Sequence, residues 1–309
     1  MGRYLFWGVL VAVLVALPPV ASALGQAFYI DLARRIMIFA IAAISLNLIL
    51  GYGGLVSFGH AAYLGVGGYA VAIFAFYGVH DGFLQWGVAI GASALVALAI
   101  GAVSIRTSGI YFIMITLAFT QMLYYLGISL EEYGGDDGMR LKARSQFAGL
   151  IDLGDPVAFY YLALALMLLS VAFVHRIVNS RFGLALRAAK SNEARSRAIG
   201  FNPYPYRLAA FVLAGAMCGL AGALYANHTN YIVPGLMSWQ QSGDLMFMVI
   251  LGGMASTAGP VLGSFALLFV EELLKGWTEH WQVILGPLLV LSVIFFRRGL
   301  AGIFYKPDA

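Results

Sequence analysis

Long apolar runs follow one another along the chain, separated by short polar segments. A helix needs about 20 predominantly apolar residues to cross the roughly 30 Å hydrocarbon core of a bilayer. The runs do not alternate between polar and apolar residues, which favours helices over the strands of a membrane barrel. The pattern therefore predicts an all-α integral membrane protein, a polytopic bundle of about ten transmembrane helices. The expected spans are residues 4–24, 33–50, 58–78, 83–104, 109–128, 157–175, 207–226, 243–257, 260–275 and 282–296.

Two of these spans are irregular. Residues 243–257 form a short, glycine-rich run with Asp244 near its start, which predicts a tilted or broken helix. The first span combines Arg3, an apolar stretch over 4–17 and small residues at 21–23. These features fit either a cleavable signal peptide or a retained span, and we expect a retained span.

The composition excludes a soluble domain. Hydrophobic residues make up 61% of the chain and charged residues 10%, whereas a soluble domain carries about 25% charged residues. The net charge of +4 does not indicate nucleic-acid binding, because many of the basic residues gather between the sixth and seventh spans. These residues are Arg176, Arg181, Arg187, Lys190, Arg195 and Arg197.

The orientation in the membrane follows from these basic residues. Each would cost about 2.5–3.5 kcal/mol at the bilayer centre, and Lys and Arg in short loops stay on the cytoplasmic side. The segment at about 176–206 is therefore predicted to be cytoplasmic. Residues 129–156, with six acidic and three basic side chains, are predicted to lie outside. Arg34 and Arg35 are exceptions, since the same count of crossings places them outside as well.

A short helix is predicted within the cytoplasmic segment. Ser191 can cap its start, and Glu193 lies in its first turn. Arg195 and Arg197 lie near its end, where the helix dipole favours positive charge. Gly200 permits a left-handed exit, and two prolines follow. A helix of about two turns is unstable alone in water, so the segment is either a solvated basic loop or a helix docked on a partner.

Polar side chains inside the predicted spans form a second group of candidates. Such groups are expensive at membrane depth, so they line a pathway or bond to a neighbouring helix. The candidates for a substrate pathway are Asn47, Ser57, His60, Thr120, Gln121 and Asp244. Small residues also repeat at helical spacing, which predicts close approach of helices or the border of a pathway. These are Gly59, Ala62, Gly65 and Gly68, and then Gly215, Gly219 and Gly222.

Catalytic and metal-binding interpretations have little support in the sequence. Ser57 and His60 lie three residues apart, which suggests an intramembrane serine hydrolase. However, Leu55 stands where the glycine of a nucleophile elbow is required, and no acid is placed to orient the histidine. The histidines lack metal-binding spacing, and no phosphate-binding loop of the G-x-x-x-x-G-K-[ST] kind occurs. The single Cys218 lies in an apolar run and is expected to be a packing residue.

The amino-acid sequence of several segments resembles that of a known family, the permease subunits of branched-chain amino-acid ABC importers of the LivM type. In the cytoplasmic segment and the span after it, the resemblance rests on Gly183, Arg187-Ala188, Asn192-Glu193-Ala194, Ala198, Gly200, Ala210-Phe211 and Gly219-Leu220-Ala221-Gly222. Elsewhere it rests on Asn47-Leu48, the run GYGGLVSFGHAAY over 51–63, Leu251-Gly252-Gly253, Gly259-Pro260 and Gly263. The glycine loop over 134–138 and residues 255–258 depart from the family's wording.

The resemblance implies an ABC-importer permease fold, with one transmembrane domain over 1–309 and a coupling loop at about 176–206. It implies import of branched-chain or related amino acids across the bacterial inner membrane by alternating access. The implied partners are a second related permease, two cytoplasmic ATPase subunits and a periplasmic substrate-binding protein. ATP and Mg would be bound by the ATPase subunits, and this chain would carry no cofactor. The residues implied to contact the ATPase are Arg187, Ser191, Asn192, Glu193, Ala194, Ile199 and Gly200.

Three alternatives stay open. A permease of the same family could carry urea or short amides. An ion-coupled secondary transporter would need a carboxylate at mid-membrane, for which Asp244 is the candidate. An intramembrane enzyme would use Ser57 and His60. Loss of transport on replacing Asp244, without any need for an ATPase, would favour the second alternative, and full transport without the Ser57 hydroxyl would exclude the third.

Overall fold

A computed structural model describes residues 2–23, 25–149, 151–295 and 299–304. Ten helices in this part of the chain coincide with the ten predicted spans. Residues 24 and 296, which end the first and the last predicted span, lie outside the described residues. Both ends of the predicted domain, residues 1 and 309, also lie outside them. The helices are α1 (Gly2–Ala23), α2 (Ala27–Asn47), α3 (His60–Phe76), α4 (Gly82–Ser104), α5 (Ile110–Ser129), α6 (Pro156–Val178), α9 (Pro203–Thr229), α10 (Trp239–Gly252), α11 (Gly259–Trp277) and α12 (Trp281–Phe295).

Shorter elements connect these helices. They are the π-helical turn η1 (Leu48–Tyr52), the 3-10 turns η2 (Glu131–Tyr133), η3 (Gly135–Asp137) and η4 (Pro234–Met237), the strands β1 (Met139–Arg140) and β2 (Tyr231–Ile232), and the helices α7 (Arg181–Ser191), α8 (Glu193–Ala198) and α13 (Ala301–Phe304). The two strands pair antiparallel. The eighth span, predicted to be tilted or broken, is a helix of 14 residues that starts earlier than expected and ends in a turn.

Polar residues set where several helices begin. Asp81 accepts hydrogen bonds from the free backbone N–H groups at the start of α4, and Asp155 does the same for α6. Asn202 caps α9, and Ser238 caps α10. A side-chain oxygen at this position satisfies N–H groups that have no partner within the helix. The spans therefore begin where a polar cap meets an apolar run.

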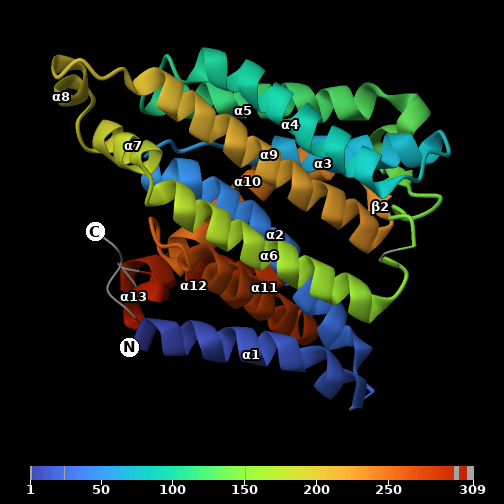
Figure 1. The fold of residues 1–309 in the computed structure, drawn as a ribbon. Helices are drawn as coiled ribbons and strands as arrows, with labels where there is room; N and C mark the ends of the chain where they lie inside the picture. The colour runs from blue at the N-terminus through green and yellow to red at the C-terminus, as the bar shows by residue number, and fades with distance from the viewer. Residues whose placement is uncertain (1, 24, 150, 296–298, 305–309) are drawn as a thin grey trace.

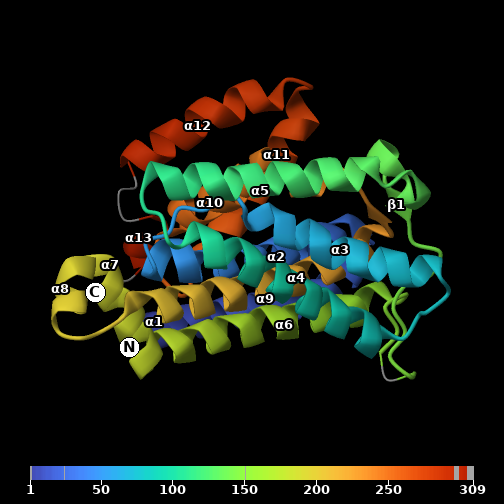
Figure 2. The ribbon, with the colours of Figure 1, turned by 90° about the horizontal axis from the view of Figure 1, so that it is seen from above.

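The long helices run alongside one another in two groups (Figure 1). The helices α3, α4 and α9 pack together, with α5 at the upper edge of the view, and α2, α6, α10 and α11 form the other group. Contacts between α2 and α9 join the two. The helix α12 stands away from the main bundle (Figure 2). The helices α7 and α8 lie at one end of the bundle and the paired strands β1 and β2 at the opposite end, and we call these the α7–α8 end and the β1–β2 end (Figure 1).

Glycines allow the backbones of α3 and α9 to touch. A Cβ added at Gly222 would lie 2.0 Å from the backbone oxygen of Leu64, and one at Gly67 would lie 2.2 Å from that of Gly219. Against α4, a Cβ at Gly215 would lie 2.4 Å from the Ala97 Cβ. Small residues permit such close approach. The glycines of α9 therefore pack helices together, as one of the two sequence interpretations predicted.

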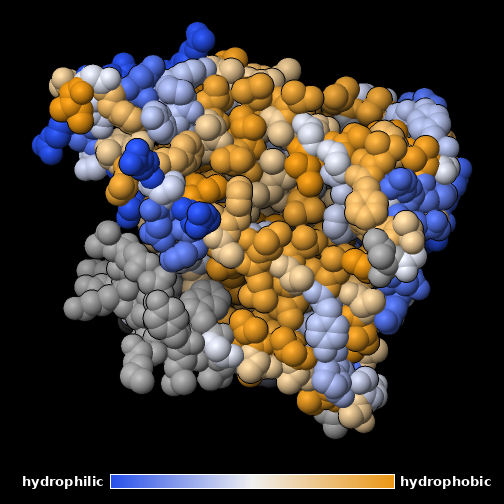
Figure 3. All heavy atoms as spheres, in the orientation of Figure 1, coloured by the Kyte–Doolittle hydropathy of each residue, from blue (hydrophilic) through white to orange (hydrophobic). Residues whose placement is uncertain are grey.

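The molecule carries an apolar band between two polar ends. Five described helical segments are long and apolar enough to cross a membrane by length and composition: Ala27–Tyr52, Gly82–Ser104, Ile110–Ser129, Pro156–Val178 and Pro203–Thr229. Shorter apolar helices cover Leu10–Ala23, His60–Phe76 and Trp281–Ser292. Figure 3 shows hydrophobic atoms across the middle of this face, with hydrophilic atoms at the α7–α8 and β1–β2 ends. This distribution suits a bundle surrounded by lipid.

The two arginines that did not fit the predicted orientation are neutralised by carboxylates. Arg34 lies 2.5 Å from an Asp31 oxygen. Arg35 pairs with Glu271 at 3.2 Å and approaches Glu272 at 3.9 Å, both on α11. Paired in this way, they carry little net positive charge. The positive-inside rule counts Lys and Arg in short loops and is not a net-charge rule, so the two arginines remain exceptions to the predicted orientation, although their charges are paired.

Candidate functional site

Two short helices make up the predicted coupling segment. Ser180 caps α7, which ends at Ser191, and Asn192 then adopts an extended conformation and caps α8. The Asn192 Oδ1 accepts a hydrogen bond of 2.8 Å from the Arg195 backbone N–H. The predicted cap at Ser191 is wrong, because Ser191 is the last residue of α7. The predicted exit at Gly200 is confirmed by its φ of +82°.

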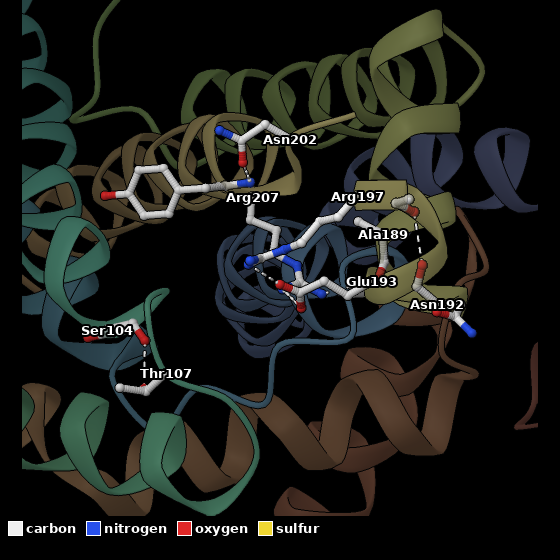
Figure 4. Close-up of polar contacts among 10 residues, drawn as sticks. Ser104, Thr107, Ala189, Asn192, Glu193, Arg197, Asn202 and Arg207 are labelled. Carbon is white, nitrogen blue, oxygen red and sulfur yellow. Dashed lines mark hydrogen bonds and ion pairs between the residues drawn. The ribbon is translucent and has the colours of Figure 1, made fainter. Parts of the chain in front are cut away.

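The Glu193 carboxylate holds this segment on the bundle (Figure 4). Its Oε2 accepts a 2.6 Å bond from Arg207 Nη1 on α9, and its Oε1 accepts a 2.7 Å bond from Arg197 Nη2 on α8. The other nitrogen of the same guanidinium, Arg207 Nη2, donates to the Ala189 carbonyl of α7 at 3.1 Å. One arginine therefore ties α7, α8 and α9 together. We call α7, α8 and this Arg207 contact the clamped segment.

The arginines also stabilise the charged form of Glu193. Partial burial of the carboxylate is the largest effect and opposes its charge, which would raise its pKa. The hydrogen bonds and positive charges of Arg207, and then of Arg197, act against that burial. The net result is a pKa lowered from the ordinary value of 4.5. The ion pairs of the clamped segment are therefore fully formed at neutral pH.

A cleft of about 620 Å³ opens beside the clamped segment, between α8 and the connection from α4 to α5. Arg106 is one of its lining residues, and its guanidinium carbon lies 5.9 Å from the centre of the Tyr204 ring. At the end of α4, beside the cleft, the Thr107 hydroxyl donates a 2.7 Å hydrogen bond to the Ser104 carbonyl (Figure 4). The residues lining the cleft are Ile105, Arg106, Thr107, Ser108, Glu193, Ala194, Arg197, Tyr204 and Arg207.

The remaining coupling candidates divide into one inward and several outward residues. Arg187 reaches back to the Val178 carbonyl at the end of α6, at 3.5 Å. Ala194 and Gly200 are exposed, and Ile199 is 79% exposed. Leu184 on α7 is also exposed, at 58%. The outward face of the clamped segment therefore presents apolar side chains beside its charges.

The candidate pathway residue Asn47 fixes a turn between two helices. Asn47 is buried, and its Nδ2 donates to the Ser256 carbonyl at 2.8 Å. Its Oδ1 accepts a 3.1 Å bond from the Ala255 backbone N–H. Ala255 has a φ of +58°, a conformation that costs energy for a residue with a Cβ. Both hydrogen-bonding functions of Asn47 therefore hold the connection from α10 to α11 in place.

Three further pathway candidates are buried in helix contacts. Ser57 accepts a bond from the Gly59 N–H at 3.2 Å, and the His60 Nε2 lies 2.7 Å from the Ser45 Oγ. Thr120 donates to the Phe58 carbonyl at 3.3 Å. Ser57 and His60 therefore bond to different residues and not to each other, so the pair required for a serine hydrolase is not formed in this part of the chain.

The last two pathway candidates face outward. Gln121 on α5 is partly exposed, and Asp244 on α10 is exposed. The helices α5 and α10 contact each other. The structure thus separates the six residues into a buried set on α2, α3, α5 and the segment before α3, and an outward pair on α5 and α10. No group of three or more metal-ligating side chains was found among the described residues.

Four residues of this arrangement were not predicted to be site residues, although Lys190 was counted among the basic residues that set the orientation. Ser45 bonds to His60, Ser242 accepts a 3.0 Å bond from the Ala61 N–H, and Arg207 holds the clamped segment. Lys190 donates to the Gly51 carbonyl at 2.6 Å. Each contact joins residues of different elements, 14 or 15 positions apart for Arg207 and Ser45 and 181 or 139 positions apart for Ser242 and Lys190. A pattern of spacing along the sequence could not have indicated them.

Comparison with known proteins decides the family. A model of the permease component of branched-chain amino-acid transport systems matches residues 28–293. The chain belongs to this permease family. The LivM permeases of the high-affinity branched-chain amino-acid transport systems of Salmonella typhimurium (strain LT2) and Escherichia coli (strain K12) are 28% and 29% identical to it over 296 residues, covering 88% of this chain and 69% of each relative.

A relative with another printed substrate also matches. The autoinducer 2 import system permease LsrC of Yersinia pseudotuberculosis (serotype O:3, strain YPIII) is 26% identical over 238 residues, covering 69% of this chain and 63% of that protein. No solved structure matches the chain. As a permease of this family, the chain is a multi-pass membrane component of an ABC-type transport system. The family assignment favours ATP-driven transport over the ion-coupled alternative.

Proposed function

We propose that this chain is the permease subunit of an ABC importer that moves branched-chain or related amino acids into the cytoplasm by alternating access. The clamped segment carries the proposal. It is a pair of short helices held on the bundle by Arg207, with Ile199 79% exposed beyond the α8 helix. An apolar side chain next to exposed arginines suits burial against a protein partner.

In this proposal, two ATPase subunits bind the α7–α8 ends of this chain and of a second, related permease. The contacts would come from the outward residues Ala194, Ile199 and Gly200, with Arg187, Ser191 and Asn192 beside them. Glu193 would act within the chain, because both of its oxygens are already bonded to arginines. ATP and Mg would be bound by the ATPase subunits, which supply the energy, and this chain would hold no cofactor.

The substrate pathway would pass along the outward faces of α5 and α10, between this chain and the second permease. Asp244 supports this assignment, because an exposed carboxylate within a predicted span is too costly to face lipid. Gln121 lies on the neighbouring helix and is partly exposed. The buried candidates Asn47, Ser57, His60 and Thr120 would hold the helices behind this face.

The whole described bundle would act as one transmembrane domain in the bacterial inner membrane, with the coupling loop at about 176–206 in the cytoplasm. A periplasmic binding protein would deliver substrate to the β1–β2 end. Branched-chain amino acids are proposed as substrates because two LivM relatives are named for them. Urea and short amides are the second candidate substrates within the same family.

Reconstituted transport tests this function. The complex that copurifies with the tagged chain is placed in vesicles, and uptake of labelled leucine is measured with and without ATP, and with an ion gradient instead of ATP. We expect ATP-dependent uptake that unlabelled isoleucine and valine suppress and urea does not. Uptake driven by an ion gradient alone would contradict the proposal. Suppression by urea or acetamide would assign the second substrate class.

A further inference from the structure

Lys190 links the clamped segment to the membrane bundle. Its ammonium reaches from the end of α7 to the Gly51 carbonyl of η1, with 2.6 Å between Nζ and the oxygen. Its aliphatic stem lies over Gly54, where an added Cβ would be 2.9 Å from the Lys190 Cγ. A short hydrogen bond from an ion is about twice as strong as a neutral one. This contact joins two segments 139 residues apart.

The Gly51 carbonyl needs a donor from outside its own helix. The last carbonyls of a helix lack partners within it and form the negative end of its dipole. In η1, the Leu50 carbonyl accepts from the Gly54 N–H at 3.2 Å, and the Ile49 carbonyl accepts from the Leu55 N–H at 2.9 Å. The Lys190 ammonium bonds the next carbonyl in the series. A positive charge is well suited to that position.

The same turn lies against the α10–α11 connection. A Cβ added at Gly51 would lie 2.6 Å from the Ala255 backbone nitrogen. Asn47, one turn earlier, bonds to both Ala255 and Ser256. Single π-helical turns are frequent at functional sites, where they interrupt the regular helix ladder. The turn η1 therefore contacts α7 on one side and the α10–α11 connection on the other.

The clamped segment consequently has polar links to both helix groups. Arg207 ties α8 and the end of α7 to α9, which packs with α3 and α4. Lys190 ties α7 to η1 at the end of α2, which packs with α6, α10 and α11. A displacement of α7 and α8 would therefore act on both groups. The group that contains α10 and Asp244 is linked through Arg187, which bonds to the Val178 carbonyl of α6 at 3.5 Å, and through Lys190, whose contact to η1 is the shorter of the two at 2.6 Å.

We infer that Lys190 is a positioning residue that transmits displacement of the clamped segment to η1 and through it to the α10–α11 connection. The inference rests on the proposed function, because the displacement would come from the ATPase subunits. The contact between Lys190 and Gly51 can be tested without them. The Lys190–Gly51 contact and its role in transport can therefore be refuted independently of each other.

The first experiment measures amide hydrogen exchange of the purified chain in detergent. Lys190→Met removes the ammonium and keeps the apolar stem. We expect exchange at the amides of residues 53–55 to rise about tenfold, the effect of losing one hydrogen bond to a charged group. Lys190→Arg should restore much of the protection. Lys142→Met is the matched control, because Lys142 donates to the Phe76 carbonyl at 3.3 Å near the β1–β2 end.

The second experiment compares ATP hydrolysis with leucine uptake in the reconstituted complex. We expect Lys190→Met to retain ATP hydrolysis and its ATPase chains but to lose most uptake, while Lys190→Arg recovers it and Lys142→Met resembles the wild type. Unchanged exchange and uptake in Lys190→Met would overturn the inference. Loss of the ATPase chains from Lys190→Met would also overturn the inference, because Lys190 would then be a docking residue. A Lys190→Met chain that no longer folds would overturn it as well. Failure of the wild type to couple uptake to ATP would instead count against the proposed function.

Discussion

Arg207 binds Glu193 across the break between α8 and α9, with 2.6 Å between Nη1 and Oε2. The Arg207 side chain is 13% exposed and that of Glu193 is 34% exposed. The pair lies at the foot of a two-turn helix that could not persist alone in water. This ion pair therefore holds α8 against α9 and is one of the contacts that fix the clamped segment on the bundle.

Replacing Glu193 with Gln should lower stability in a pH-dependent way. The pKa of Glu193 is lowered from 4.5 in the folded chain, so its stabilisation is complete above that value and is lost as the pH falls through the lowered pKa. We expect Glu193→Gln to cost about 1 kcal/mol near neutral pH, as for a partly exposed ion pair. Thermal unfolding of both chains from about pH 3 to pH 8 measures the difference.

The difference in stability between the wild type and Glu193→Gln should stay constant across the neutral range and shrink below pH 4.5. Glu131→Gln is the control, because Glu131 is an exposed carboxylate near the β1–β2 end and should show no such difference. A gap between wild type and Glu193→Gln that widened in acid would contradict the assignment of the charged form to the folded chain.

Replacing Gly222 with Ala should separate α3 from α9. The added Cβ would lie 2.0 Å from the Leu64 backbone oxygen, and a backbone atom cannot move aside as a flexible side chain can. We expect the free energy of unfolding to fall by about 1–3 kcal/mol, the usual cost of overpacking. Gly87→Ala on α4 is the matched control, because nothing lies within 4 Å of its added Cβ. Equal thermal stability of the two variants would refute the close contact.

The positions of the membrane helices were predictable because apolar length alone largely decides them. Their polar caps, such as Asp81 and Asp155, stand directly in the sequence. The close packing of Gly222 was predictable for the same reason, since glycine spacing along one helix is a local signal. The family resemblance also rested on short sequence motifs, and the family match confirms it.

The pairing of polar residues was not predictable, because it depends on which helices meet. Glu193 was predicted only as a contact to a partner protein, and the bonds of its oxygens to Arg197 and Arg207 of its own chain were not foreseen. His60 was considered with Ser57, whereas it lies beside Ser45. The cap at Asn192 was missed because Ser191 and Asn192 are both good caps. Only the bend between α7 and α8 selects the second.

Asp244 should be reachable from water although it lies on an apolar helix. The only cysteine of the chain, Cys218, is buried, so an introduced cysteine can be labelled against little background. We expect Asp244→Cys in the reconstituted complex to react with a charged, membrane-impermeant thiol reagent. Leu98→Cys on α4, whose leucine is 44% exposed, should face lipid and stay unlabelled. Equal labelling of both positions would contradict the proposed pathway face.

The central claim is that the ATPase subunits dock on the clamped segment, and the amount of ATPase retained by an Ile199→Asp chain tests it most directly. Ile199 is 79% exposed, so the substitution should leave the fold and the second permease in place. Glu131→Lys near the β1–β2 end is the control. The account predicts that ATPase chains copurify with the wild type and the control but are largely lost from Ile199→Asp. Undiminished ATPase chains on a folded Ile199→Asp complex would contradict it.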